Sequence, residues 1–553
     1  MKISLIFLFL VSITLSLYAQ KLPKNQQNAI DQVFAQWDNP NSPGCALAVV
    51  QNGKIVFSKG YGMADLEHNL AITPQNVFYI GSVSKQFVTM CMLLLEEEGK
   101  INLDDDIHKY FPEMPDYGYP INIRNLIHHT SGIRDYLQLW EMSGRNYLDE
   151  IEEEEVLDII FRQKALNFEP GTRYLYSNSC YFMMAMIVKK ITGKSIREYA
   201  QEHIFGPLRM KNTQFYNDNR RLIKNRAFGY GEPFEGEFSN MMMRFDLVGS
   251  GGIYSTVEDL YLWDQNFYQN KLGKQGNKLI EKMLTNGKYN DGSDIDYAFA
   301  LDKQVYKGLN TFGHGGALGG YRSQFIQFPD QKTSVIILAN LASMNPGNLA
   351  FQVADIVLAD KFTETTSNET QSEIPAIKLS PKKMTEFEGY YWNNWSNYSR
   401  RIYLKDKTLM YWRGENNESE LIPIGENRFQ MKGTAVPLYV QFESDKMIVQ
   451  EGDRQPVPID RYTPISPDAD QLKEYSGKYK AAEIDENYQL KVVDGKLVLV
   501  LPDAEVPLDP IYKDVFFQGF VGQVSFQRDD SGAVSGLLLD ADRVRRMWFE
   551  RVD

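Results

Sequence analysis

The sequence predicts an α+β domain, an antiparallel sheet flanked by helices, followed by two small antiparallel β-barrels. Four β-rich segments predict two hairpins of the sheet: 45–51 with 54–59, and 321–328 with 333–340. Asn52-Gly53 is typical of the tight turn that joins such strands. The apolar run 87–95 predicts a buried helix, and the chain after residue 377 consists of short strands with alternating apolar residues.

The first domain is expected to span residues 20–362. A helix from about Gly347 to Lys361 should close it, and Glu152–Glu155 should begin another, because acidic side chains suit a helix N-terminus. The segment that follows is polar and carries few apolar side chains. Residues 363–377 are therefore predicted to be a linker.

The region after the linker repeats itself. Two pairs of segments match: 384–391 with 472–479, and 440–445 with 524–529. Repeated units of short strands, with turns rich in glycine and asparagine, predict one barrel at 378–463 and a second at 468–553.

A cleaved secretory signal is expected at residues 1–19. Lys2 precedes the apolar run Ile3–Leu17, and Tyr18-Ala19-Gln20 follows it. The run is short for a membrane span, so an uncleaved anchor is the lesser alternative. No later segment is apolar enough to cross a bilayer, and we expect a secreted or periplasmic protein without a stable membrane span.

Composition limits the partners and cofactors. The formal net charge of −13 argues against nucleic acid as a partner. The six histidines show no zinc-ligand spacing, and neither a metal nor an organic cofactor is expected. The pair His128-His129 would point apart on a strand, and we interpret it as structural. Cys45, Cys91 and Cys180 lie among apolar residues and predict buried free thiols, with one disulfide as the alternative in an oxidising compartment.

The segment 81–87, Gly-Ser-Val-Ser-Lys-Gln-Phe, places a serine hydroxyl one helical turn before a lysine amine. A free serine is a weak nucleophile near neutral pH and needs a base within hydrogen-bond reach. Residues three apart share a helix face, so Lys85 is positioned to take the proton of Ser82. The same spacing recurs at 380–383 and by itself is also typical of a helix cap.

Two later motifs add groups that a serine hydrolase uses. Tyr176-Ser177-Asn178 offers a phenol that relays a proton and an amide that binds Lys85 or a substrate carbonyl. His314 lies among glycines, whose backbone lets a ligand approach closely. It would either hold Tyr176 by a hydrogen bond or bring positive charge near a substrate carboxylate. The ordinary alternatives are a packing tyrosine and a glycine-rich turn. No Gly-x-Ser-x-Gly occurs, which excludes the usual nucleophile elbow of α/β-hydrolases.

With Ser-x-x-Lys, Tyr-x-Asn and His-x-Gly in this order, the chain resembles the penicillin-recognising serine hydrolases. That group includes class C β-lactamases, DD-peptidases, esterases and D-aminopeptidases. The resemblance covers roughly residues 26–361 and implies a β-lactamase/transpeptidase-like fold and serine hydrolase activity for residues 20–362. A catalytic domain followed by two barrels is most similar to the bacterial D-aminopeptidases.

The resemblance also implies roles for the motif residues. Ser82 would be the nucleophile, Lys85 its base, and Tyr176 the group that passes a proton to the leaving group. The backbone N–H groups of Ser82 and Ala317 would form an oxyanion hole. Five residues would contact the substrate or its oxyanion: Asn178, His314, Gly315, Gly316 and Ala317. All of them precede the linker, so the barrels are expected to carry no catalytic residue and to pack on the first domain.

The substrate is the least determined part of this prediction. Histidine at 314, where most β-lactamases have lysine, argues against efficient penicillin hydrolysis. D-aminopeptidases have a long loop of the last barrel in the active site, whereas the corresponding turn here, 518–522, is short.

We therefore expect a secreted serine hydrolase of D-aminopeptidase or DD-peptidase type. It would cleave amide or ester bonds of a small molecule or short peptide through an acyl-enzyme. The alternatives are a short-chain esterase, a weak β-lactamase, and a binding or sensor protein that is acylated without turnover. The sequence carries no signal for an oligomeric state.

Overall fold

The structure is a computed structural model that describes residues 21–552 except 146–148, 235, 242, 363–374, 416, 435–436, 453–454 and 502–503. The predicted signal peptide at 1–19 lies outside the described residues, as does most of the predicted linker at 363–377. Within the described part of the chain, every helix is too short or too polar to cross a bilayer.

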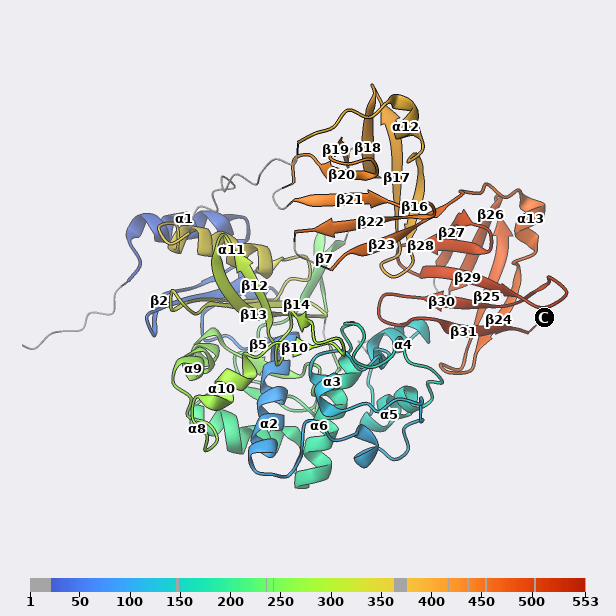
Figure 1. The fold of residues 1–553 in the computed structure, drawn as a ribbon. Helices are drawn as coiled ribbons and strands as arrows, with labels where there is room; N and C mark the ends of the chain where they lie inside the picture. The colour runs from blue at the N-terminus through green and yellow to red at the C-terminus, as the bar shows by residue number, and fades with distance from the viewer. Residues whose placement is uncertain are drawn as a thin grey trace, which may run out of the picture.

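A six-stranded antiparallel sheet forms the centre of the first domain (Figure 1). Its order is β12-β13-β14-β15-β1-β2, with the bounds β1 Cys45–Gln51, β2 Lys54–Tyr61, β12 Asp302–Tyr306, β13 Leu309–Leu318, β14 Tyr321–Phe328 and β15 Thr333–Ala339. The predicted turn joins β1 to β2, with positive φ at Asn52 (49°) and Gly53 (75°). Pairing of β1 with β15 brings the two predicted hairpins together in one sheet.

Helices cover both faces of this sheet. On one face α1 (Lys24–Phe34) packs beside α11 (Pro346–Val357). On the other face α9 (Val257–Tyr268) contacts β1 and β15. Alternate residues of β1 therefore enter two separate apolar cores: Cys45, Leu47 and Val49 in the first, and Ala46, Ala48 and Val50 in the second.

A helical region extends from the second face and contains the most buried helix of the domain. This helix, α2 (Lys85–Glu97), is buried continuously from Lys85 to Leu95 and packs against α6 (Asn178–Thr192). In Figure 1 the two helices lie side by side below the sheet. Two of the candidate residues, Lys85 and Asn178, are thus the first residues of neighbouring helices.

Shorter elements complete the first domain. The other helices are α3 Ile123–Ile127, α4 Tyr136–Met142, α5 Glu153–Phe161, α7 Ile196–Ala200, α8 Gly206–Leu208 and α10 Lys278–Met283. The small sheets are β3 Met63–Asp65 with β4 Leu70–Ala71, β5 Phe78–Tyr79 with β9 Ile253–Ser255 and β6 Gln214–Phe215, β7 Tyr230–Phe234 with β8 Glu237–Asn240, and β10 Gly287–Lys288 with β11 Asp294–Ile295. Helix α5 begins after Glu152, as the acidic run predicts.

Two closed eight-stranded antiparallel barrels follow (Figure 1). The first begins with α12 Pro381–Thr385 and contains β16 Gly389–Asn393, β17 Tyr398–Lys405, β18 Thr408–Gly414, β19 Asn417–Pro423, β20 Arg428–Met431, β21 Leu438–Phe442, β22 Lys446–Glu451 and β23 Val457–Tyr462. The second begins with α13 Ala469–Lys473 and contains β24 Gly477–Ala481, β25 Glu486–Val493, β26 Lys496–Leu501, β27 Ala504–Tyr512, β28 Val515–Gln518, β29 Gly522–Arg528, β30 Val534–Asp540 and β31 Met547–Arg551.

The repeat in the sequence is also a repeat of contacts. Tyr391 donates a hydrogen bond to the carbonyl oxygen of Phe387 at 3.0 Å, four residues earlier. At the matching position of the second barrel, Tyr479 donates to the carbonyl oxygen of Tyr475 at 2.8 Å. The predicted α+β domain followed by two barrels is therefore confirmed.

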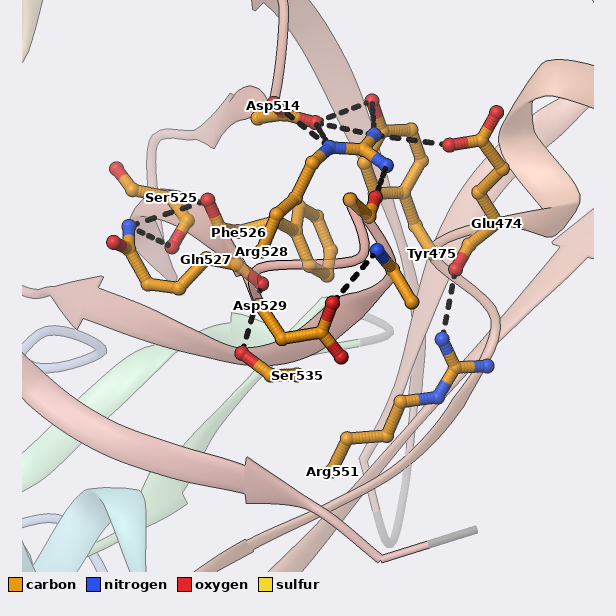
Figure 2. A network of polar contacts seen from close by, with 12 residues as sticks. Glu474, Tyr475, Asp514, Ser525, Phe526, Gln527, Arg528, Asp529, Ser535 and Arg551 are labelled. Atoms are coloured by element: carbon orange, nitrogen blue, oxygen red, sulfur yellow. Dashed lines mark hydrogen bonds and ion pairs between the residues drawn. The ribbon is translucent and has the colours of Figure 1, made fainter.

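The second barrel also carries a polar network around Arg528 (Figure 2). The guanidinium of Arg528 lies 2.7 Å from Asp514 and 2.9 Å from Glu474. The hydroxyl of Tyr475 donates to Asp514 at 3.0 Å, whereas the first barrel has Phe387 at this position. Because Glu474 and Tyr475 follow α13, the network ties that helix to the barrel wall.

A buried ion pair attaches the second barrel to the first domain. Arg134 lies just before α4, and its Nη1 is 2.7 Å from Glu483 Oε2, with side chains 0% and 7% exposed. The other guanidinium nitrogen, Nη2, donates to the carbonyl oxygens of Arg545 at 2.8 Å and Arg546 at 3.2 Å. This barrel therefore packs on the first domain, as expected, and its β30–β31 loop is held against the segment before α4.

Candidate active site

Ser82 and Lys85 lie where the chain enters its most buried helix. A 3₁₀ turn, Gly81–Ser84, precedes α2, and Gly81 has a φ of 53°, in the left-handed region that favours glycine. Lys85 Nζ lies 3.0 Å from Ser82 Oγ. The two groups that the sequence pairs by spacing are thus within hydrogen-bond distance.

Complete burial changes the acid–base behaviour of Lys85. Burial holds the pKa of its amine well below the usual lysine range; the charge of Arg543 lowers it further, and Asp135 opposes the shift. Besides Ser82, its Nζ contacts Asn178 Oδ1 at 2.9 Å and the carbonyl oxygen of Ser250 at 2.5 Å. A neutral amine fits these contacts, because it donates two hydrogens to the carbonyl oxygens and keeps a lone pair for the Ser82 hydroxyl.

Asn178 connects Lys85 to a buried carboxylate that the sequence analysis missed. Its Nδ2 and its backbone N–H both donate to Asp135 Oδ2, at 2.8 Å and 2.6 Å. The other oxygen of Asp135 accepts from the N–H groups of Leu137 and Gln138. One carboxylate therefore caps α4 and α6 and fixes the amide of Asn178 with its oxygen toward Lys85. The sequence predicted that the Asn178 amide binds either Lys85 or a substrate carbonyl. The structure shows the contact with Lys85.

Tyr176 lies beside Lys85 and lines a pocket together with Ser82 and Asn178. Its ring centroid is 4.8 Å from Lys85 Nζ and 4.9 Å from the guanidinium carbon of Arg543. Burial raises the pKa of the Tyr176 phenol above its usual value, although a hydrogen bond with Ser82 and the charge of Arg543 oppose this shift. The phenol is therefore protonated at neutral pH, which suits a proton donor.

His129 supports the ring of Tyr176 from behind. The two ring centroids are 4.2 Å apart, and His129 Nδ1 accepts the backbone N–H of Ser177 at 3.1 Å. The prediction that this histidine lies on a strand is wrong: α3 ends before His128, and His129 has a φ of 57°. Burial holds the pKa of His129 well below its usual value, so the ring is neutral.

His314 lies on β13 and contacts a tyrosine that the motif did not suggest. Its Nδ1 donates to the carbonyl oxygen of Gly315 at 2.6 Å, so Nε2 accepts the hydroxyl of Tyr297 at 3.1 Å. Neither predicted role of His314 is borne out by these contacts. Its ring centroid is 6.2 Å from that of Tyr176, and burial lowers its pKa, although Asp302 opposes the shift. The imidazole is thus neutral.

Strand β13 passes directly over the Ser82 turn because two positions lack side chains. A Cβ at Gly316 would lie 2.1 Å from the carbonyl oxygen of Ile80 and 2.9 Å from Ser82 N. A Cβ at Gly81 would lie 2.7 Å from Ala317 N. The backbone nitrogens of Ser82 and Ala317 therefore belong to two segments in close contact, as a two-donor oxyanion hole requires.

Most of the candidate residues line one pocket of about 800 Å³. Its wall includes Ser82, Tyr176, Asn178, His314, Gly315, Gly316 and Ala317, with Lys85 buried behind Ser82. The wall also contains charged side chains outside the three motifs: Asp302, Arg322 and Arg543. Among the described residues, no group of three or more histidine, cysteine or acidic side chains is placed to hold a metal ion.

Arg543 is the contribution of the second barrel to this pocket. The turn singled out from the sequence, 518–522, is short, as expected, and joins β28 to β29. The loop that reaches the site is instead the one between β30 and β31. No local motif marks Arg543, so the sequence offered no signal for it. The three cysteines are buried and unpaired, which confirms the prediction of free thiols.

Comparison with known proteins agrees with this geometry. The Beta-lactamase family model matches residues 30–357. D-aminopeptidases of Brucella canis and Brucella anthropi are 31% and 30% identical over 328 residues, which cover 59% and 58% of this chain. The matched region covers 61% and 60% of those proteins, so the chain spans about three fifths of the length of these relatives.

Solved structures share the fold at lower identity. The octameric penicillin-binding protein homologue from Pyrococcus abyssi has a TM-score of 0.54 and 22% identity, covering 79% of this chain and 99% of that chain. D-amino acid amidase from Ochrobactrum anthropi SV3 has a TM-score of 0.51 and 21% identity, covering 61% and 99%.

The family match extends from α1 to the end of α11 and contains each of the three motifs. It spans more than half of the chain. The chain therefore belongs to the Beta-lactamase family.

Proposed function

We propose that this chain is a serine hydrolase that cleaves amide or ester bonds of small substrates through an acyl-enzyme. A D-aminopeptidase-like or DD-peptidase-like amidase is the favoured type, because relatives named D-aminopeptidase are 31% identical to this chain over 328 residues. Secretion, with residues 1–19 as a cleaved signal, belongs to the same proposal.

One observation carries the proposal: the amine of Lys85, fully buried and with a lowered pKa, lies 3.0 Å from the hydroxyl of Ser82. A neutral amine beside a serine hydroxyl at a pocket wall is the arrangement that activates the serine.

Acylation follows from these positions. Lys85 takes the proton of Ser82 as the serine oxygen bonds to the substrate carbonyl carbon. The carbonyl oxygen gains negative charge and is stabilised by the N–H groups of Ser82 and Ala317; one such donor is typically worth about 10²–10³ in rate. The bond to the leaving group then breaks as Tyr176 gives its proton to the leaving nitrogen or oxygen, and Lys85 restores that proton.

Deacylation uses the same groups in reverse. Water loses a proton to the site base and attacks the ester carbon, and Ser82 recovers its proton as the acid product leaves. Asn178 keeps the Lys85 amine aimed at Ser82 in both steps, because Asp135 holds its amide.

Covalent labelling and turnover test the proposal together. A fluorophosphonate should label the full-length chain once, at Ser82, and Ser82→Ala should abolish labelling and turnover of short-chain nitrophenyl esters. The matched control is Ser343→Ala, which removes the same hydroxyl from an exposed serine of the pocket wall.

A substrate panel decides the type of hydrolase. It should contain D- and L-alanyl amides, acyl-D-Ala-D-Ala peptides, short esters and a chromogenic cephalosporin. Hydrolysis of D-amides that stops on N-acetylation supports the aminopeptidase, and ester turnover alone supports an esterase. Labelling of Ser82 without turnover on any substrate would contradict the hydrolase and support a sensor protein that is acylated by its ligand.

A further inference from the structure

The loop between β30 and β31 is fixed so that Arg543 enters the pocket. The carbonyl oxygen of Arg543 accepts Asn167 Nδ2 at 3.0 Å, and Asn167 Oδ1 accepts the N–H of Arg545 at 2.7 Å. Arg134 holds two carbonyl groups further along the loop, those of Arg545 and Arg546. Hydrogen bonds at the carbonyl group of Arg543 and at Arg545 and Arg546 therefore fix the backbone of the loop at and after Arg543.

The guanidinium of Arg543 lies beside Tyr176 at the pocket wall. Its carbon is 4.9 Å from the ring centroid of Tyr176, the residue proposed to protonate the leaving group. Its Nη1 is 3.8 Å from Asp135 Oδ2, and its Nε is 3.4 Å from the exposed carboxylate of Asp542. The side chain keeps 37% of its surface exposed at the pocket wall, so an incoming ligand has access to it.

Two described positions on the strand side of the pocket carry no positive charge. His314 is neutral, and Gly315 has no side chain. Arg322, which pairs with Ala317 across β13 and β14 and also lines the pocket, directs its Nη1 toward the carbonyl oxygens of Gly319 and Tyr321. Asp302 also lines the pocket, and burial raises the pKa of its carboxyl.

We propose that Arg543 is a specificity-determining residue that binds a carboxylate carried by the leaving group. The planar fork of a guanidinium matches the two oxygens of a carboxylate, and the pairing is strong because both groups are charged. The favoured substrates would release an amino acid or hydroxy acid with a free carboxylate. This inference rests on the proposed hydrolase function and narrows its substrate class.

Pairs of substrates that differ only in whether the leaving group carries a free carboxylate separate carboxylate binding from the catalytic steps. One pair is acetyl-D-Ala-D-Ala and its C-terminal amide; the other is the phenylacetyl ester of 3-hydroxybenzoate and the same ester with the carboxylate methylated. The readout is the ratio of kcat/KM for the free acid to that for the capped partner. Because both members of a pair use Ser82, Lys85 and Tyr176 alike, any effect of Arg543 on those groups cancels in the ratio.

We expect a ratio above about ten in the parent protein, and a fall of roughly tenfold or more in Arg543→Gln, the loss typical of a hydrogen bond to a charged group. Arg543→Lys should retain part of the ratio. The matched control is Arg546→Asn, which removes a positive charge from the same loop, at an exposed side chain, and keeps a residue that tolerates its φ of 51°. A parent ratio near one, or an equal fall in Arg546→Asn, would overturn the proposal.

A binding measurement separates this inference from the proposed function. Calorimetry with Ser82→Ala requires no turnover and compares N-acetyl-D-alanine with its amide as ligands. Preferential binding of the acid that disappears in Ser82→Ala/Arg543→Gln supports the carboxylate site even if the parent hydrolyses nothing. Equal binding of acid and amide refutes the site even if Ser82 is labelled and turns over esters.

Discussion

Replacing Arg134 by methionine should loosen the attachment of the second barrel by about 4 kcal/mol. The guanidinium donates to four acceptors: Gln163 Oε1 at 2.9 Å, Glu483 Oε2 at 2.7 Å and the carbonyl oxygens of Arg545 at 2.8 Å and Arg546 at 3.2 Å. The first three of these contacts are buried. A thioether replaces none of these bonds. Removing one partner of a buried ion pair typically costs about 3–5 kcal/mol, because the other charge stays buried. Here Glu483 would retain the N–H of Lys164 at 2.6 Å, which places the expected loss inside that range.

Amide hydrogen exchange measures this loss of stability at the contact between the second barrel and the first domain. The N–H groups of Arg545 and Lys164 report on the contact, because they bond to Asn167 and Glu483 across the two domains. A loss of about 4 kcal/mol in local opening corresponds to roughly 10³-fold faster exchange.

The control for this prediction is Arg145→Met, which breaks an exposed pair with Glu155 (side chains 51% and 45% exposed) and should change local stability by less than about 1 kcal/mol. Adding Glu483→Gln to Arg134→Met should recover part of the loss, since the unpaired charge is removed. Exchange at Arg545 and Lys164 within about threefold of the parent would refute the reasoning.

Three further predictions concern the site and the core. Gly316→Ala should abolish fluorophosphonate labelling, because a Cβ would lie 2.1 Å from the Ile80 carbonyl oxygen, whereas Gly347→Ala, with no atom nearer than 3.4 Å, should label normally. The acid limb of kcat/KM against pH should fall well below the usual lysine pKa, since burial lowers the pKa of Lys85 and the base must be neutral; a midpoint near 10 would contradict this. Burial raises the pKa of Asp264 to about 6 from 3.8, so the folded state binds this proton more tightly. Its contribution to stability is complete below pH 3.8 and is lost, by about 3 kcal/mol, as pH rises through 6. Asp264→Asn should remove that slope from thermal midpoints measured between pH 4 and 7, and an unchanged slope would count against it.

Local sequence patterns predicted what depends on local geometry. The three-residue spacing of Ser82 and Lys85 predicted their contact, although Ser82 lies in the 3₁₀ turn before α2 and Lys85 is the first residue of that helix. The repeated segments predicted two barrels because each unit must close its own sheet, and the tyrosine bonds of Tyr391 and Tyr479 repeat with them.

Contacts between distant segments were beyond such patterns. Asp135 reads as an ordinary helix cap, and only the packing of α4 against α6 places it on Asn178. His314 follows the motif in sequence, yet its partner is Tyr297, which reaches it only through the fold. Arg543 is one arginine among many in the sequence, and its position depends on how the second barrel docks.

The closure of the second barrel also sets the order in which the pocket is completed. β24 pairs with β31, so the barrel closes only when its last strand is in place, and the loop with Arg543 lies just before that strand. Ribosomes deliver the N-terminal part of a chain first, and domains generally fold as they emerge. Ser82 and Lys85 are therefore made long before the arginine that faces them. The part of the pocket wall that contains Arg543 is therefore complete only after the last strand of the second barrel has been made and paired.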